Sequence, residues 1–96
     1  MIVMRIGVCT LHLRLSENHS LKEKRRAIKS IKDRVKSKFN VSIAEVDALD
    51  NWQWAVLGVA CVSNDSGFVN SVLSNVINFI EDTHLADLVD YEIEIR

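Results

Sequence analysis

The order in which hydrophobic periodicity changes along this chain constrains its fold more than any other feature. Four segments alternate apolar and polar residues or are apolar throughout, as strands are: residues 2–15, 41–46, 53–63 and 88–95. Two others, 20–39 and about 64–82, repeat their apolar residues every three or four positions, which is the period of a helix. The elements therefore follow one another as β-α-β-β-α-β.

Right-handed crossovers fold such a chain into a ferredoxin-like α+β sandwich, a four-stranded antiparallel sheet with two helices on one face. The first and third strands then lie side by side at the centre of the sheet. The chain of 96 residues is long enough for a single domain, residues 1–96, and its 48% hydrophobic content is that of a folded protein. No apolar run reaches the roughly 18 residues of a membrane-spanning helix. A signal peptide is not expected, because the start lacks a basic stretch and a cleavage site.

Local signals predict how several elements begin and which faces they bury. Ser20 and Glu23 fit a capping box, in which Ser20 accepts from the amide of Glu23 and the Glu23 side chain returns to the amide of Ser20. Gly7 and Gly58 lie within the central strands, where we expect close helix packing or a bulge; a shallow groove on the open face is the alternative. In the last strand, alternation predicts Val89, Tyr91, Ile93 and Ile95 inward and Asp90, Glu92 and Glu94 outward.

Charge is strongly segregated within the chain. Residues 20–38 hold nine of the twelve basic residues against two acids, a net charge of +7, whereas residues 40–96 hold ten acids and one base, a net charge of −9. The total of −1 hides this dipole, which indicates a binding surface more than a catalytic centre.

The first helix concentrates its positive charge on one side. At 100° per residue, six cations fall within a wedge of about 120° beside the apolar stripe, and Asp33 is the only acid among them. Lysine and arginine heads at one-turn spacing suit the phosphates of a nucleic-acid backbone. A solvated face, balanced by the acidic last strand of the same molecule or of a partner, is the alternative. The predicted nucleic-acid-binding residues are Lys22, Arg25, Arg26, Lys29, Lys32 and Lys36.

Three further side chains allow two interpretations each. Lys24 falls inside the apolar stripe, so its stem is expected to snorkel along the core edge; alternatively, its head points towards the loop after the first strand. Trp52 and Trp54 lie on one side of the third strand, where core or dimer packing and base stacking are the alternatives. The central strands lack the aromatic residues of an RNA-recognition motif.

The third strand offers apolar side chains to both faces of the sheet, although helices can cover only one. An uncovered apolar face is unfavourable in a monomer, so we expect a homodimer or another partner on the open sheet face. The acids of the last strand would guard that edge against further strand addition.

Catalysis and metal binding have little support in the sequence. His12, His19 and His84 lack metal-ligand spacing, and Cys9 and Cys61 do not form a CxxC pair, so two buried reduced thiols are expected. The loop after the first strand lacks the glycine and arginine of a phosphate-binding loop. The start of the second helix, residues 63–67, could hold an anion, but Asp65 opposes it and a plain cap is expected. We therefore expect no enzyme activity, no cofactor, no metal and no small-molecule substrate.

Several motifs resemble the YlxP-like family of small bacterial proteins of unknown function. They are Ser-Leu-Lys-Glu-Lys-Arg-Arg at 20–26, Phe-Asn-Val-Ser-Ile-Ala-Glu-Val at 39–46, Trp-Gln at 52–53, Leu-Gly-Val-Ala at 57–60 and Val-Ser-Asn-Asp at 62–65. The resemblance implies the ferredoxin-like fold, a cytoplasmic location, a tendency to dimerise and a link to translation, since members are described as ribosome-binding-factor-like. It supplies no catalytic residues, and Asn18-His19 departs from the small residues expected before the first motif.

Two functions are consistent with these patterns. The first is a non-enzymatic protein that engages RNA or the ribosome through the basic helix. The second is a homodimeric interaction or regulatory module without a nucleic-acid ligand. A small hydrolase is disfavoured because the loop residues that it needs are missing.

Overall fold

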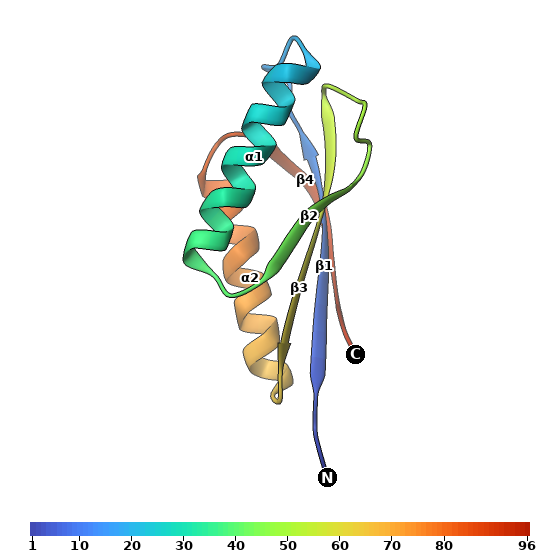
Figure 1. Cartoon of the computed structure of the whole chain (residues 1–96), viewed down its shortest axis with the longest axis vertical. Coiled ribbons are helices and arrows are strands. Elements are labelled where there is room, and N and C mark those ends of the chain that lie inside the picture. The colour runs from blue at the N-terminus through green and yellow to red at the C-terminus, as the bar shows by residue number, and fades with distance from the viewer.

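A computed structural model describes all residues, 1–96, and confirms the predicted order of elements (Figure 1). The six elements are β1 (Arg5–Arg14), α1 (Leu21–Lys38), β2 (Ser42–Asp47), β3 (Trp54–Ser63), α2 (Ser66–Asp82) and β4 (Asp87–Ile95). The strands form one antiparallel sheet in the order β2-β3-β1-β4, so β1 and β3 are central, as expected for a ferredoxin-like fold.

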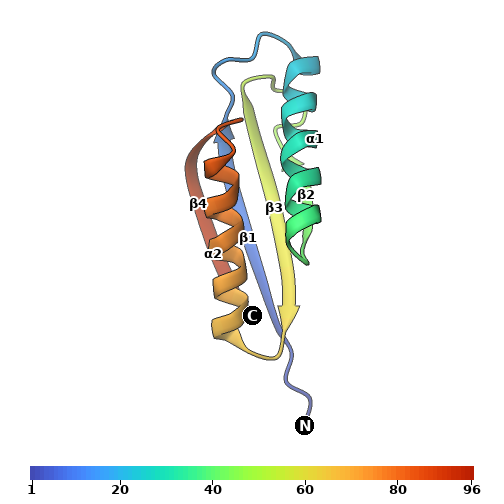
Figure 2. The ribbon, with the colours of Figure 1, turned by 90° about the vertical axis from the view of Figure 1, so that its left-hand side faces the viewer.

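Both helices lie on the same face of the sheet (Figure 2). Helix α1 packs over β2, whereas α2 packs over β1, β3 and β4. The domain is elongated along its strands, with extents of 52 × 21 × 18 Å, because the ten-residue strands β1 and β3 lie side by side and residues 1–4 extend beyond them (Figure 1). None of its helices has the length and apolar character needed to cross a membrane.

The core lies between the sheet and the two helices. Alternate residues of β1 and β3 point into it, and the helices contribute side chains at three- and four-residue spacing. Its buried members include Cys9, Leu11, Leu13, Ala55, Leu57, Val59, Cys61, Ile28, Ile31, Val35, Val69, Leu73, Val76 and Ile80.

The first strand is shorter than its apolar pattern predicts. Regular pairing begins at Arg5, which lies opposite Ser63, and Ile6 exchanges two backbone hydrogen bonds with Arg96. Residues 1–4 extend beyond the sheet at the end marked N in Figure 1, because no neighbouring strand reaches that far.

The prediction for the last strand is wrong at Val89. Between His12 and Leu13 the pairing of β1 with β4 shifts from Asp90 to Leu88, so one residue of β4 is left over in a bulge. Val89 is consequently 54% exposed, and Leu88 packs against the core in its place. Beyond the bulge, Ile93 and Ile95 pack against the core as predicted, whereas Tyr91 on this edge strand remains 49% exposed.

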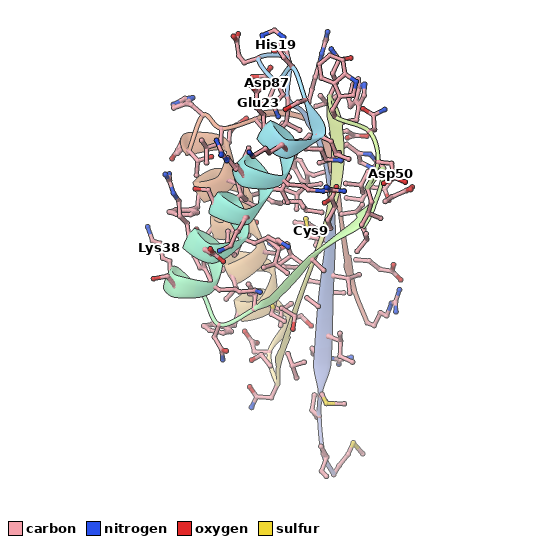
Figure 3. The ribbon with its side chains drawn as sticks, turned by 45° about the horizontal axis from the view of Figure 1, so that its top comes forward. Cys9, His19, Glu23, Lys38, Asp50 and Asp87 are labelled. Carbon is pink, nitrogen blue, oxygen red and sulfur yellow. The ribbon has the colours of Figure 1, made fainter.

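Both helices begin with the polar caps that the sequence predicts, with one difference. The Ser20 hydroxyl accepts from the amide of Glu23 at 3.1 Å, but the Glu23 carboxylate accepts from the amide of His19 at 2.7 Å instead of that of Ser20. Figure 3 shows His19 and Glu23 together at this end of α1. Asp65 caps α2 by accepting from the amide of Phe68 at 2.8 Å. Each cap satisfies an amide that the helix leaves unpaired.

Substitution of Gly7 by alanine is expected to destabilise the fold. A Cβ atom at Gly7 would lie 2.9 Å from Leu73 Cδ1 and closer still to Val69 Cγ1, and both side chains are buried in α2. Overpacking of this kind costs about 1–3 kcal/mol. Urea unfolding of Gly7→Ala should show this loss. Gly67→Ala is the matched control, because its Cβ would meet only Asp65 Oδ2 at 3.4 Å and alanine favours the helix.

The two thiols are expected to be unreactive in the folded protein. Burial raises the pKa of Cys9 from 9.0 to about 11 and also raises that of Cys61. At pH 8, a thiol reagent should modify both only after denaturant is added, because the thiolate is the reactive form. Since the folded pKa lies above the unfolded one, Cys9 should also make stability fall as pH rises from 9 towards about 11. Rapid modification of the native protein would contradict this assignment.

Candidate nucleic-acid interface

The two flanks of α1 have different neighbours. Lys36 lies beside Val41 and Ser42 at the β2 edge of the sheet, whereas the Nζ of Lys38 lies 4.8 Å from the ring centroid of Phe79 in α2. Figure 3 shows Lys38 at the C-terminal end of this helix. Because residues three and four apart share a helix face, the six predicted cations lie on the flank that Lys36 marks or on the adjoining outer surface. We call this set the basic flank: Lys22, Arg25, Arg26, Lys29, Lys32 and Lys36.

Five members of the basic flank have no ion-pair partner. Only Lys29 is paired, with its Nζ 2.6 Å from the Asp33 carboxylate one turn further on. The hydrogen bond from Lys29 lowers the pKa of Asp33, and the charges of Lys29, Lys36 and Lys32 lower it further. The single acid of this surface therefore lies in a positive field that it does not neutralise.

The acids of β4 do not balance the basic flank within the same molecule. Strand β4 is the opposite edge of the sheet from β2, and Asp90, Glu92 and Glu94 form no ion pair with α1. The Glu94 carboxylate is held by Arg96 at 3.1 Å, and that hydrogen bond lowers the pKa of Glu94. The acids of β4 therefore make no direct ion pair with the basic flank, and a solvated flank and an external partner both stay as interpretations.

Lys24 behaves unlike the other cations of α1, and neither interpretation of it is correct. Its side chain is fully buried, and its Nζ lies 2.8 Å from the Glu45 carboxylate of β2. It also donates to the carbonyl of Ala48 at 2.6 Å, in the turn between β2 and β3. Ala48 has a φ of 57°, which is left-handed backbone that an alanine adopts only at a cost. Lys24 therefore ties α1 to this strained turn and is not available to a ligand.

The sheet face without helices, which we call the open face, is apolar at its centre. Its residues come from all four strands: Ile6, Val8, Thr10, His12 and Arg14 of β1, Trp54, Val56, Gly58, Ala60 and Val62 of β3, Ser42, Ala44, Val46 and Asp47 of β2, and Asp90, Glu92 and Glu94 of β4. Nothing within the chain covers it. The predicted split of β3 between two apolar faces is confirmed.

A hollow of about 600 Å³ lies on the open face over β2, β3 and β1. Small residues form its floor, chiefly Gly58, Ala60 and Ala44, with Val8 and Val46 beside them and Lys36 at the β2 rim. Gly58 is small because Val46 lies over it: a Cβ there would be 3.0 Å from Val46 Cγ1. Of the two interpretations of these glycines, a groove on the open face is correct for Gly58. Close helix packing is correct for Gly7, which lies against α2.

The two tryptophans are not core residues. Trp52 and Trp54 are 40% and 39% exposed, and Trp54 lies on the open face, opposite Arg14 of β1. The Arg14 guanidinium lies 5.9 Å from the Trp54 ring centroid, within cation–π range. Trp54 is thus exposed at one end of the open face.

The three histidines do not form a metal site. His12 is half-buried on the open face, His19 precedes α1, and His84 has a φ of 56° in the turn before β4. No three histidine, cysteine, aspartate or glutamate side chains gather as metal ligands would.

Comparison with known proteins places the chain in a family. Residues 6–93 match the family described as "Protein of unknown function (DUF503)", and the chain belongs to this family. It is 40% identical over 76 residues to "Uncharacterized protein YlxP" of Bacillus subtilis (strain 168), covering 79% of this chain and 83% of that protein. The predicted YlxP-like resemblance is therefore confirmed, and the function of the family is unknown.

A solved structure with a similar fold is the de novo designed protein Foldit4. The two superpose with a TM-score of 0.52 over 97% of this chain and 93% of the designed chain, at 17% sequence identity. This likeness concerns the fold alone. A designed protein with this architecture fits the view that the order of elements and their patterning specify the sandwich.

Removal of the Lys24 charge is expected to destabilise the protein strongly. Lys24→Met would leave the Glu45 carboxylate, whose side chain is only 13% exposed, without its counter-charge, and the Ala48 carbonyl without a donor. Breaking one half of a buried pair costs about 3–5 kcal/mol. In urea unfolding, the double variant Lys24→Met/Glu45→Met should regain much of this loss. If the single and double variants were equally unstable, the Ala48 bond would be the dominant contact instead.

Proposed function

We propose that this protein is a non-enzymatic binding protein, cytoplasmic in location, whose basic flank engages RNA through phosphate contacts. The observation that carries the proposal is a helix flank of six cations, five of them without an ion-pair partner, beside an edge strand. Such a surface suits a phosphate backbone, where each neutralised phosphate releases a counterion.

Two features favour backbone recognition without base readout. The cations recur along an 18-residue helix, which is about 27 Å long and spans several phosphates of a duplex strand. In addition, the major groove of an A-form RNA duplex is too deep and narrow for side chains to read, so cations on a helix flank meet phosphates and 2′-hydroxyls. We name ribosomal RNA as the target class because the family resemblance implies a link to translation.

The RNA proposal predicts steep salt dependence. An affinity set by four to six phosphate contacts should fall by about 10²–10³-fold between 50 and 200 mM salt and depend little on sequence. Fluorescence anisotropy with a labelled RNA duplex, followed by sedimentation with ribosomal subunits, measures both. Lys22→Glu/Arg25→Glu/Lys32→Glu should abolish binding while leaving the unfolding midpoint near that of the parent, because all three side chains lie outside the core.

A matched pair of single variants separates the effect of the basic flank on RNA binding from the effect of net charge alone. Arg25→Glu lies on the basic flank, whereas Arg34→Glu makes the same charge change on the side of α1 that faces α2. Arg25→Glu should weaken RNA binding more than Arg34→Glu. Equal effects would mean that only net charge matters, and no RNA binding by the parent would rule out this function.

The second candidate function is a homodimeric interaction module. The observation that favours it is the open face, where β1 and β3 expose apolar side chains that no element of the chain covers. In this case the acidic strand of another copy, and not RNA, meets part of the basic flank.

A further inference from the structure

We infer that two copies pack open face to open face, with the two-fold axis running along the strands between β1 and β3. This inference rests on the second proposed function, the homodimer, and specifies its geometry. Three features of the chain select this arrangement. Like charges oppose edge-to-edge pairing, the sizes of the facing side chains fit, and opposite charges meet at the rims of the contact.

Edge-to-edge pairing of like strands is unfavourable at both edges. Pairing β2 with the β2 of a second copy would bring two basic flanks together, since α1 lies over this strand. Pairing β4 with β4 would juxtapose two sets of Asp90, Glu92 and Glu94. Like charges side by side oppose association, so a closed dimer uses the open face instead.

The open face is large enough for a stable contact. Ten-residue central strands at about 3.3 Å per residue, in a sheet of four strands about 4.8 Å apart, give roughly 600 Å² on each copy. Two copies would then bury about 1,200 Å², which reaches the range of specific interfaces.

Rotation about a two-fold axis parallel to the strands leaves each row of paired residues at the same position along the axis. It places β1 of one copy over β3 of the other. Val8 is paired with Ala60, and Thr10 with Gly58, so in the dimer Val8 of one copy lies over Ala60 of the other, and Thr10 lies over Gly58 beside the Val46 side chain that covers it. Val8 therefore enters the hollow instead of meeting a large side chain. Arg14 likewise lies over Trp54 of the second copy.

The same operation exchanges the two edges, so that β4 of one copy faces β2 of the other. One row of paired residues crosses the sheet from β4 to β2: Glu92, Thr10, Gly58 and Ala44. Glu92 and Glu94 thus lie over Ala44 and Ser42 of the second copy, along the β2 rim that Lys36 occupies, and only Asp90, over Asp47, meets an acid. An axis perpendicular to the strands would instead place β4 over β4, acid on acid, and β1 over β1.

A charge swap tests the rim contact in the full chain. In sedimentation velocity at low salt, Lys36→Glu and Glu92→Lys should each raise the dimer Kd by about tenfold or more, because both rims then repel. An equimolar mixture of the two variants should recover dimer, since each mixed dimer holds two opposite-charge rims. Arg34→Glu is the control, because Arg34 lies on the opposite side of α1 and should leave the Kd unchanged.

Cross-linking tests the orientation directly. A short bismaleimide should link Ala44→Cys to Glu92→Cys in a mixture and link neither variant to itself, and the buried native thiols should remain unmodified. Links within Glu92→Cys alone would keep the dimer but overturn this geometry. A parent protein that stays monomeric at all concentrations would overturn the dimer itself, and RNA binding by that monomer would leave the first proposed function intact.

Discussion

Two helices of this length can cover only one face of a four-stranded sheet, and the rest of the structure depends on this constraint. Both helices lie on the same side, so the central strands bury one set of side chains and expose the other. An antiparallel sheet tolerates one solvated face when that face is polar. Here the exposed side chains of β1 and β3 are largely apolar, and the acids lie on the two outer strands, Asp47 on β2 and three acids on β4. The fold therefore produces an apolar surface with charged rims as a direct result of its topology.

The same topology keeps the two halves of the charge dipole apart. Helix α1 lies over β2 at one edge, and β4 forms the other edge, with the two central strands between them. The intervening strands are each about 4.8 Å wide, so the rims are separated by more than a Debye length at physiological salt. The positive and negative surfaces thus act on other molecules more than on one another. This separation makes a near-neutral protein capable of strong local electrostatics.

The fold could be predicted from the sequence because its signals are local. Periodicity in 20–39 and 64–82, the caps at Ser20 and Asp65 and the apolar run of β3 each depend on neighbouring residues. Lys24 could not be predicted, because its partners Glu45 and Ala48 lie more than twenty residues away and meet it only in the folded chain. The position of Val89 depends on a bulge in the pairing with β1, which alternation within β4 does not encode.

The candidate site could likewise be predicted from the sequence only in part. Periodicity alone places the basic flank on one side of α1, but it does not show which neighbour that side borders. Only the folded structure shows that Lys36 borders the hollow over β2, β3 and β1. Nor does the sequence show that Val46 lies over Gly58, because β2 and β3 meet through a register shift between Glu45 and Asp47.

The two proposed functions share one residue and are coupled through it. Lys36 belongs to the basic flank and also borders the hollow, so in the inferred dimer it lies at the rim that faces Glu92 and Glu94 of the second copy. The remaining cations lie further along α1 or turn outward, so they stay accessible. An acidic strand at one end of the flank would repel phosphates there and leave the N-terminal half of α1, with Lys22, Arg25 and Arg26, as the stronger RNA contact. Dimer formation and RNA binding would then oppose each other modestly at Lys36, and because each changes the affinity of the other by the same factor, RNA would in turn weaken the dimer.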